Sequence, residues 1–216
     1  MKRLLLIALA LAAAVASCTH RPELRNGDLV FVGIPMDYSL DSTSMDAAIS
    51  AATGGPGLNL IHVAIAEVKG DSTWIIDATL KRGVHRHPLD TFLADFTLKD
   101  GSLPEFIIKR VSGADAGDAV ERAKTFCGQP YDLYFLAGND AMYCSELVQN
   151  SYLDAAGNQV FSSQPMNFAA PDGTMPVYWK QLFAILGMDV PQGEPGTNPQ
   201  SMSESKNLVE ITGLKL

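Results

Sequence analysis

The sequence predicts one α+β domain in which an antiparallel sheet or barrel packs against helices. Strand-like and helix-like segments do not alternate regularly along the chain, which disfavours a doubly wound parallel sheet. Two strand-like segments are joined by a short polar turn, so they form an antiparallel hairpin. The 216 residues are 47% hydrophobic and 19% charged, a composition that supports a packed core and not a disordered chain.

The predicted strands are mostly apolar runs that turn residues separate. The first follows the turn Asn26–Asp28, and Lys69–Ser72 joins the two arms of the hairpin. The last is an edge strand. In chain order the strands are Leu29–Ile34, Leu60–Val68, Thr73–Thr79, Gly83–Pro88, Glu105–Val111 and Leu208–Ile211.

The predicted helices rest on capping residues and on apolar residues at helical spacing. Ser44 or Ser42 caps the first helix, and the segment Thr53–Gly57 ends it. The helices are Ser44–Ala52, Leu89–Phe96, Asp115–Cys127, Cys144–Leu153 and Val177–Leu186. The tail Pro191–Lys206 is rich in Pro, Gly, Ser and Asn, which predicts an extended loop packed on the surface.

The N-terminus has the pattern of an export signal. Lys2 and Arg3 precede the apolar run Leu4–Val15, which suits a signal peptide and is too short to span a bilayer comfortably. The following Val15-Ala16-Ser17-Cys18 resembles the bacterial lipobox, in which cleavage precedes a cysteine that carries diacylglycerol. An ordinary secretory signal with a chance cysteine is the alternative.

The lipobox interpretation divides the chain into three parts. Residues 1–17 are a lipoprotein signal peptide, residues 18–26 a lipidated tether attached through Cys18, and residues 27–216 a single domain. The expected location is the bacterial cell envelope, with the protein anchored in a membrane and facing the periplasm or the outer surface.

Charge and cysteine content exclude several classes of function. The formal net charge of −8 argues against a nucleic-acid partner, because phosphate binding needs clustered Lys and Arg. There are three cysteines, and Cys127 and Cys144 remain once Cys18 is lipidated; they are able to pair in an oxidising compartment. No CxxC or HxxxH spacing is present, so neither a metal nor a cofactor is expected, and the oligomeric state stays open.

Cys144 is the candidate nucleophile. It lies at the predicted start of a helix, where free backbone N–H groups and the positive end of the helix dipole favour a thiolate. The same N–H groups are able to stabilise an oxyanion. An isolated cysteine is more often a buried structural residue than a nucleophile. The catalytic interpretation of Cys144 therefore depends on finding a histidine that acts as its base.

His62 is the candidate base among the four histidines. It lies inside an apolar strand, where a histidine is either structural or catalytic. His85 and His87 alternate on a short polar strand, a pattern typical of a solvated face, and His20 lies in the tether.

Asp77 is the candidate orienter of that base. If Val68 faces Thr73 across the hairpin, Asp77 faces Ala64 and His62 is its diagonal neighbour on the same face. Asp77 then accepts a hydrogen bond from the imidazole, as the third member of a triad does. A capping or turn carboxylate is the alternative role.

These residues belong to a pattern that resembles the YiiX/YebB-like hydrolases, circularly permuted relatives of the NlpC-type cell-wall peptidases in the papain-like superfamily. The resemblance extends over residues 24–205. The matching segments are Asp28, Ala48–Thr53, His62-Val63-Ala64-Ile65, Ile76-Asp77-Ala78, Gly83-Val84, Pro130-Tyr131-Asp132, Tyr143-Cys144-Ser145-Glu146-Leu147-Val148 and Pro195-Gly196-Thr197-Asn198-Pro199.

The resemblance implies a permuted papain-like fold and a cysteine peptidase or amidase. It assigns Cys144, His62 and Asp77 to catalysis and Tyr131 to substrate contact or the oxyanion pocket. Aspartate stands where permuted relatives often have glutamate, and its shorter side chain reduces its reach. Glu146 is interpreted as a carboxylate that favours the helix start.

Three functions follow from this resemblance. The first is an amidase or peptidase acting on a peptide or another amide in the envelope. The second is a lipid-directed acyl hydrolase or acyltransferase, since permuted papain-like folds include the lecithin–retinol acyltransferase group; a long apolar pocket lined by groups such as Trp179, Phe183 and Leu186 favours it. The third is a binding lipoprotein with an inactive site.

Overall fold

A computed structural model describes residues 23–35, 38–54 and 57–216. The predicted signal peptide and the lipidation of Cys18 lie outside the described residues. Within the described residues, no helix combines the length and the hydrophobicity that crossing a membrane requires.

The centre of the fold is a six-stranded sheet in the order β4-β3-β2-β1-β5-β8. Every neighbouring pair is antiparallel, and Val68 pairs with Thr73 as the hairpin turn predicts. The strands are β1 (Asp28–Pro35), β2 (Leu58–Lys69), β3 (Ser72–Thr79), β4 (Gly83–Pro88), β5 (Glu105–Val111) and β8 (Leu208–Glu210). Because β1 and β2 are buried along nearly their whole length, both faces of the sheet are covered.

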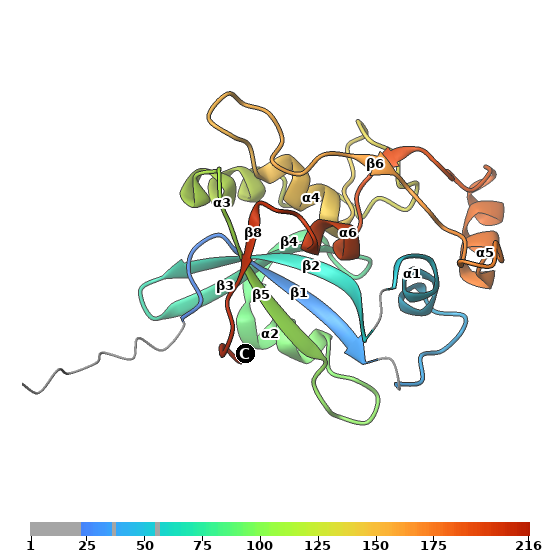
Figure 1. Cartoon of the computed structure of the whole chain (residues 1–216), viewed down its shortest axis with the longest axis horizontal. Helices are drawn as coiled ribbons and strands as arrows, with labels where there is room; N and C mark the ends of the chain where they lie inside the picture. Colours follow the sequence, from blue (N-terminus) through green and yellow to red (C-terminus); the bar gives the residue numbers. More distant parts are fainter. Residues whose placement is uncertain (1–22, 36–37, 55–56) are drawn as a thin grey trace, which may run out of the picture.

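Helices cover the two faces differently (Figure 1). One face packs against α3 (Ala116–Thr125), α4 (Cys144–Ser151) and α6 (Pro199–Ser203), and the opposite face packs against α2 (Leu89–Asp95). The predicted α+β class is therefore confirmed. Residues 23–26, which the sequence analysis assigned to the tether, already contact the domain: the backbone N–H of Val68 donates to Asn26 Oδ1.

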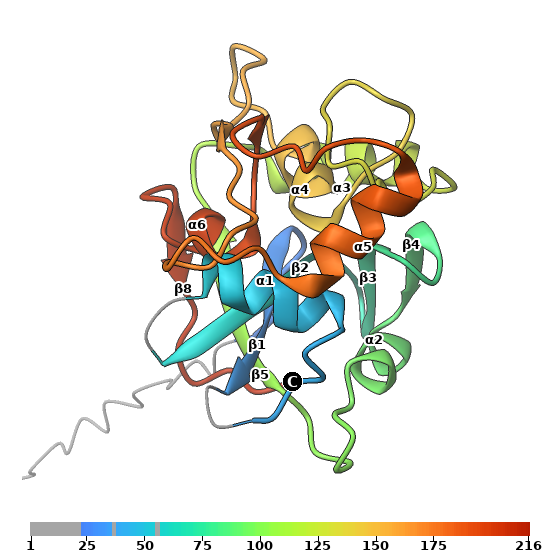
Figure 2. The same ribbon diagram turned by 90° about the vertical axis from the view of Figure 1, so that its right-hand side faces the viewer.

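A third group of buried residues lies beside the sheet. Helices α1 (Met45–Thr53) and α5 (Val177–Leu186) lie next to each other across this side of the molecule (Figure 2). The Ser44 side chain caps α1, as predicted. The buried residues of this side include an aromatic cluster formed by Phe135, Tyr143, Phe168, Trp179 and Phe183.

The tail Pro191–Lys206 is not the extended surface loop that its composition predicts. It contains β7 (Pro195–Gly196), which pairs with β6 (Gln164–Pro165), and then α6, which packs on β2. The Asn198 side chain caps α6 and Pro199 occupies its first turn, where a missing N–H has no cost. The same residues that suggest a loop therefore start a short helix.

Candidate active site

Cys144 is the first residue of α4, and its side chain is 5% exposed. The N-cap residue Tyr143 makes no side-chain bond to the first turn, so side-chain capping does not occupy these N–H groups. Instead, the Tyr143 hydroxyl accepts a hydrogen bond from the Thr197 backbone N–H at 3.1 Å. Thus the segment before α6 anchors the start of the helix that carries the thiol.

His62 lies on β2 beside an irregularity in the sheet. Val32 pairs with His62 and Gly33 pairs with Leu60, so Ile61 is an extra residue in β2. Such a bulge changes the direction of the neighbouring side chains. His62 is 7% exposed, and its ring packs against Phe96, with ring centroids 4.8 Å apart.

Asp77 makes the predicted contact with His62. Its Oδ2 lies 2.9 Å from His62 Nε2, and the residue is 1% exposed. The bond engages Nε2, which leaves Nδ1 of His62 as the ring atom available to the thiol. The aspartate side chain therefore reaches the imidazole although it is shorter than the glutamate that permuted relatives often have at this position.

The side chains of Cys144, His62 and Asp77 stabilise one another in their charged forms. Burial disfavours the His62 imidazolium, but the nearby Cys144 and the hydrogen bond to Asp77 outweigh it and raise the pKa of His62 to about 10. Burial likewise opposes ionisation of Asp77, yet hydrogen bonds from His62 and His87 lower its pKa to about 2. The arrangement therefore favours a charged imidazole next to the sulfur at neutral pH.

His87 is a residue of this site that the sequence analysis missed. Its Nε2 lies 2.9 Å from Asp77 Oδ1, and it is 5% exposed, so the prediction of a solvated face is wrong for His87. The prediction holds for His85, which is exposed. The register of β3 and β4 pairs Asp77 with His85, which makes His87 the diagonal neighbour. Applying the hairpin argument to this second turn would have found it.

Two hollows meet at Cys144. The first is lined by His62 together with Met45, Asp46, Ile49, Ile61, Ala78, Thr79, Leu80, Phe96, Tyr131 and Cys144. Tyr131 also lines the second hollow, so it stands with Cys144 at the border between the two. The structure therefore brings Cys144, His62 and Tyr131 to one place, with Asp77 behind His62.

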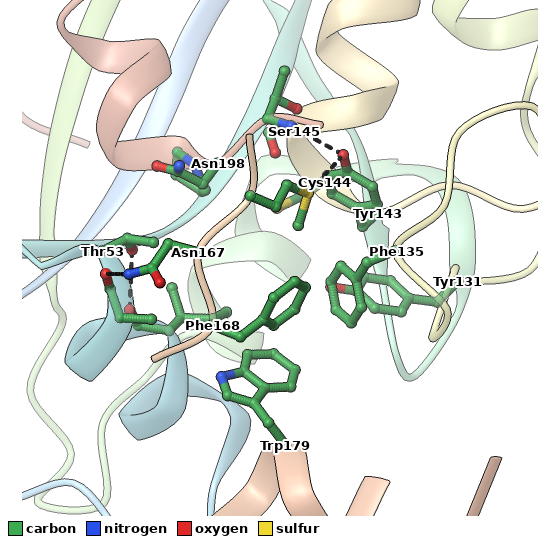
Figure 3. A pocket seen from close by; sticks show the side chains of 15 residues that line it. Thr53, Tyr131, Phe135, Tyr143, Cys144, Ser145, Asn167, Phe168, Trp179 and Asn198 are labelled. Atoms are coloured by element: carbon green, nitrogen blue, oxygen red, sulfur yellow. Dashed lines mark hydrogen bonds between the residues drawn. The ribbon is translucent and has the colours of Figure 1, made fainter. Parts of the chain in front are cut away.

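The second hollow is an aromatic pocket without a charged side chain in its lining. Figure 3 shows Phe135, Phe168 and Trp179 on one side of it, and Cys144 on another. Phe135 has a φ of 53°, a left-handed conformation that costs a bulky residue about 1 kcal/mol or more. Contacts of its ring with Tyr143, Phe168 and Trp179 hold it there. Sequence reasoning found Trp179 but not the two phenylalanines.

Two further side chains that bear on the sequence analysis are the carboxyl of Glu146, two residues after Cys144, and the thiol of Cys127. Burial and the neighbouring Asp132 raise the pKa of Glu146 to about 7, so this carboxyl is partly neutral near pH 7 and is not simply a dipole-stabilising charge. Cys127 is exposed while Cys144 is buried, and both are free thiols. The structure thus contains no disulfide between them.

The side chains of the site do not form a metal-binding set. Asp77 Oδ2 is hydrogen-bonded to His62 Nε2, and Asp77 Oδ1 is hydrogen-bonded to His87 Nε2. Across residues 23–35, 38–54 and 57–216, no three His, Cys, Asp or Glu side chains gather as a metal site requires.

Comparisons with known proteins match nearly the whole domain. Residues 23–212 match the family described as "Permuted papain-like amidase enzyme, YaeF/YiiX, C92 family". The chain is 25% identical over 215 residues to the uncharacterized protein YiiX of Escherichia coli K12, covering 98% of this chain and 96% of the relative. The crystal structure of YiiX from E. coli O157:H7, described as a metalloprotein, has a TM-score of 0.66 at 24% identity and covers 89% of this chain and 97% of that chain.

Proposed function

The chain belongs to the family of permuted papain-like amidases, and from that premise we propose that it is a thiol amidase of the bacterial cell envelope, with Cys144 as nucleophile, His62 as base and Asp77 as orienter. Membership in the family confirms the resemblance found in the sequence. One observation carries the catalytic assignment: the thiol at the start of α4 shares a hollow with an imidazole whose far nitrogen is bonded to a buried carboxylate.

In the first half of the reaction, the Cys144 thiolate attacks the amide carbonyl carbon and a C–S bond forms. The carbonyl π electrons move to oxygen, and free N–H groups in the first turn of α4 stabilise the oxyanion. The tetrahedral intermediate then collapses and the C–N bond breaks. His62 gives its Nδ1 proton to the departing amine, which leaves a thioester on Cys144.

In the second half, water hydrolyses the thioester. His62 Nδ1 takes a proton from the water as its oxygen attacks the carbonyl carbon. Collapse of the new intermediate breaks the C–S bond, releases the carboxylic acid and restores the thiolate–imidazolium pair. Asp77 accepts from Nε2 throughout, which keeps the ring in one orientation.

The two hollows suggest how an amide lies across the nucleophile. Because His62 protonates the leaving amine, the amine part occupies the hollow that His62 lines. The acyl part then occupies the aromatic pocket, where Tyr131 contacts the substrate next to the scissile bond. The location in the envelope is supported by the signal-like residues 1–17 and the lipobox cysteine, Cys18.

The test is the rate at which iodoacetamide alkylates Cys144 between pH 4 and 10. It uses the full chain in a Cys127→Ser background, with alkylation read by mass spectrometry on the peptide that carries Cys144. We expect rapid alkylation already at pH 6, and a shift of the midpoint toward the value of about 8.5 for a free thiol in His62→Ala. Identical profiles in the two proteins would rule out the thiolate–imidazolium pair.

A lipid-directed acyl hydrolase or acyltransferase is the second candidate, and the uncharged aromatic pocket favours it. The pocket includes Trp179, which the sequence analysis associated with this function, but Phe183 and Leu186 do not line it. A series of p-nitrophenyl esters and p-nitroanilides with acyl chains of two to twelve carbons separates the candidates. Preference for short anilides supports the amidase, and preference for the longest esters supports the lipid enzyme.

A further inference from the structure

We propose that His87 is a positioning residue of the thiol site, which holds the Asp77 carboxylate in the orientation that His62 needs. This inference rests on the proposed function of Cys144 and His62. Each oxygen of Asp77 has its own imidazole partner, with His62 Nε2 at 2.9 Å from Oδ2 and His87 Nε2 at 2.9 Å from Oδ1.

The sheet places the three residues in a row across β2, β3 and β4. Asp77 pairs with His85 on β4, so His87 is its diagonal neighbour on one side. The register Ile65–Ile76, continued by one pair, makes His62 the diagonal neighbour on the other side. Phe92 of α2 packs against both imidazoles, with ring centroids 6.3 Å from each.

The burial of Asp77 makes the second imidazole necessary. At 1% exposure the carboxylate has almost no access to bulk water, and a buried anionic oxygen without a hydrogen-bond donor is costly. Without His87, the carboxylate gains by rotating or by sharing a single donor between its two oxygens. Either change weakens the bond from His62 Nε2 that orients the catalytic ring.

The surroundings of His87 identify it as a donor and not as a second base. Its Nδ1 is buried and has no partner among the described residues, whereas Nε2 faces Asp77. A hydrogen on Nε2 makes His87 the donor to Asp77 Oδ1. Arg86, the preceding residue, bonds Glu67 and so belongs to a different carboxylate.

The experiment compares two substitutions of similar volume that differ in their ability to donate. His87→Gln keeps an N–H donor, and His87→Met removes it. Both are made in the full chain with Cys127→Ser, and iodoacetamide alkylation of Cys144 is followed from pH 4 to 10. We expect His87→Met to lower the rate at pH 6 about tenfold, the effect of one buried hydrogen bond to a charged group, and His87→Gln to recover most of it.

His85→Ala is the matched control, because His85 is the exposed histidine of the same strand; its profile should equal that of the parent. If His87→Gln and His87→Met give the parent profile, or lower the rate equally, His87 is a packing residue only and the proposal is overturned, whatever happens to the melting temperature. Should His87→Met fail to fold, the isosteric pair His87→Asn and His87→Leu gives the same comparison.

The outcome also separates this inference from the proposed function. If the alkylation profile of Cys144 changes in His62→Ala but not in His87→Met, the proposed thiol site stands and only the positioning role of His87 is overturned. A parent protein whose Cys144 titrates as a free thiol, with or without His62, overturns both.

Discussion

Two buried carboxylates on neighbouring strands, Glu67 on β2 and Asp77 on β3, have almost the same burial and different hydrogen-bond partners. They are 0% and 1% exposed, and their hydrogen-bond partners lower the pKa of each to about 2 against the effect of burial. In the described part of the chain, the ion-pair partners of Glu67 are Arg86, Lys69 and Lys124. Asp77 contacts two imidazoles.

Consecutive residues of β4 serve the two sites. Arg86 bonds Glu67, and His87 bonds Asp77 from the opposite face of the same strand. A guanidinium does not release a proton at physiological pH, so the Glu67 cluster is able to stabilise the fold but not to transfer protons. An imidazole is able to stabilise a buried carboxylate and also to transfer a proton near neutral pH. Burial and a low pKa therefore do not distinguish the two carboxylates, whereas the chemistry of their partners does.

The largest expected effect is that of Asp77→Ala on chemistry. Loss of the orienting acceptor should lower p-nitroanilide turnover about 10²- to 10⁴-fold, the contribution of a positioned acid–base group. Circular dichroism should still show a folded protein. Turnover within a factor of two of the parent would mean that Asp77 and Glu67 have the same structural role.

Glu67→Gln should lower the stability of the fold and leave the thiol site unchanged. Removing the charge leaves Arg86 without its ion-pair partner and leaves Lys124 with Glu121 alone, so the free energy of unfolding should fall by about 1–3 kcal/mol, since these partners are partly exposed. Urea denaturation measures this change. The alkylation profile of Cys144 should stay that of the parent, and a shifted profile would link the two carboxylates.

Acid should affect both sites in the same direction. Each folded-state pKa lies below its unfolded value of about 4, so each carboxylate stabilises the fold above pH 4 and loses that contribution as the pH falls toward 2. By pH 3 the loss should be roughly 1–2 kcal/mol for each group. Glu67→Gln should reduce the slope of stability against pH between pH 4 and 2 and leave the slope above pH 5 unchanged, although the protein is less stable there than the parent. An unchanged slope in this variant would contradict the ion-pair assignment.

The smallest expected effect is that of Lys69→Ala. Its ammonium lies 3.0 Å from Glu67 Oε1, but its side chain is 61% exposed. An exposed ion pair contributes at most about 1 kcal/mol, and high salt screens it. Thermal melting at low and high ionic strength should show a slight difference at low salt only. A loss as large as that of Glu67→Gln would make Lys69 the main partner of the cluster.

Local features allowed much of this structure to be predicted. The turn Lys69–Ser72 sets the register of β2 and β3, and that register is sufficient to place Asp77 beside His62. The helix starts at Ser44 and Cys144 follow from capping and from apolar spacing in the sequence. These predictions succeed because the residues involved are close in sequence or joined by one short turn.

Two predictions failed because the burial of a side chain depends on packing between elements, which the pattern within one element does not show. His87 has the alternating pattern of a solvated strand, and it is buried because α2 folds back over it and places Phe92 against its ring. The tail forms α6 because its apolar residue Met202 finds a place against the sheet. The composition of β4 and of the tail does not show which residues will pack against His87 and Met202.

The sequence by itself determined the α+β class, the nucleophile and base candidates and the His62–Asp77 contact, because short-range register and helix capping act within a few residues. Only the tertiary structure decided that His87 is buried, that Glu67 is surrounded by cations, and that the pocket beside Cys144 is lined by aromatic residues and by no Lys, Arg, His, Asp or Glu. Its wall combines residues from α1, α5 and the segments around Phe135 and Thr197. Such a wall depends on how separate elements pack, and hydrophobic packing is non-directional, so no periodicity in the sequence specifies it.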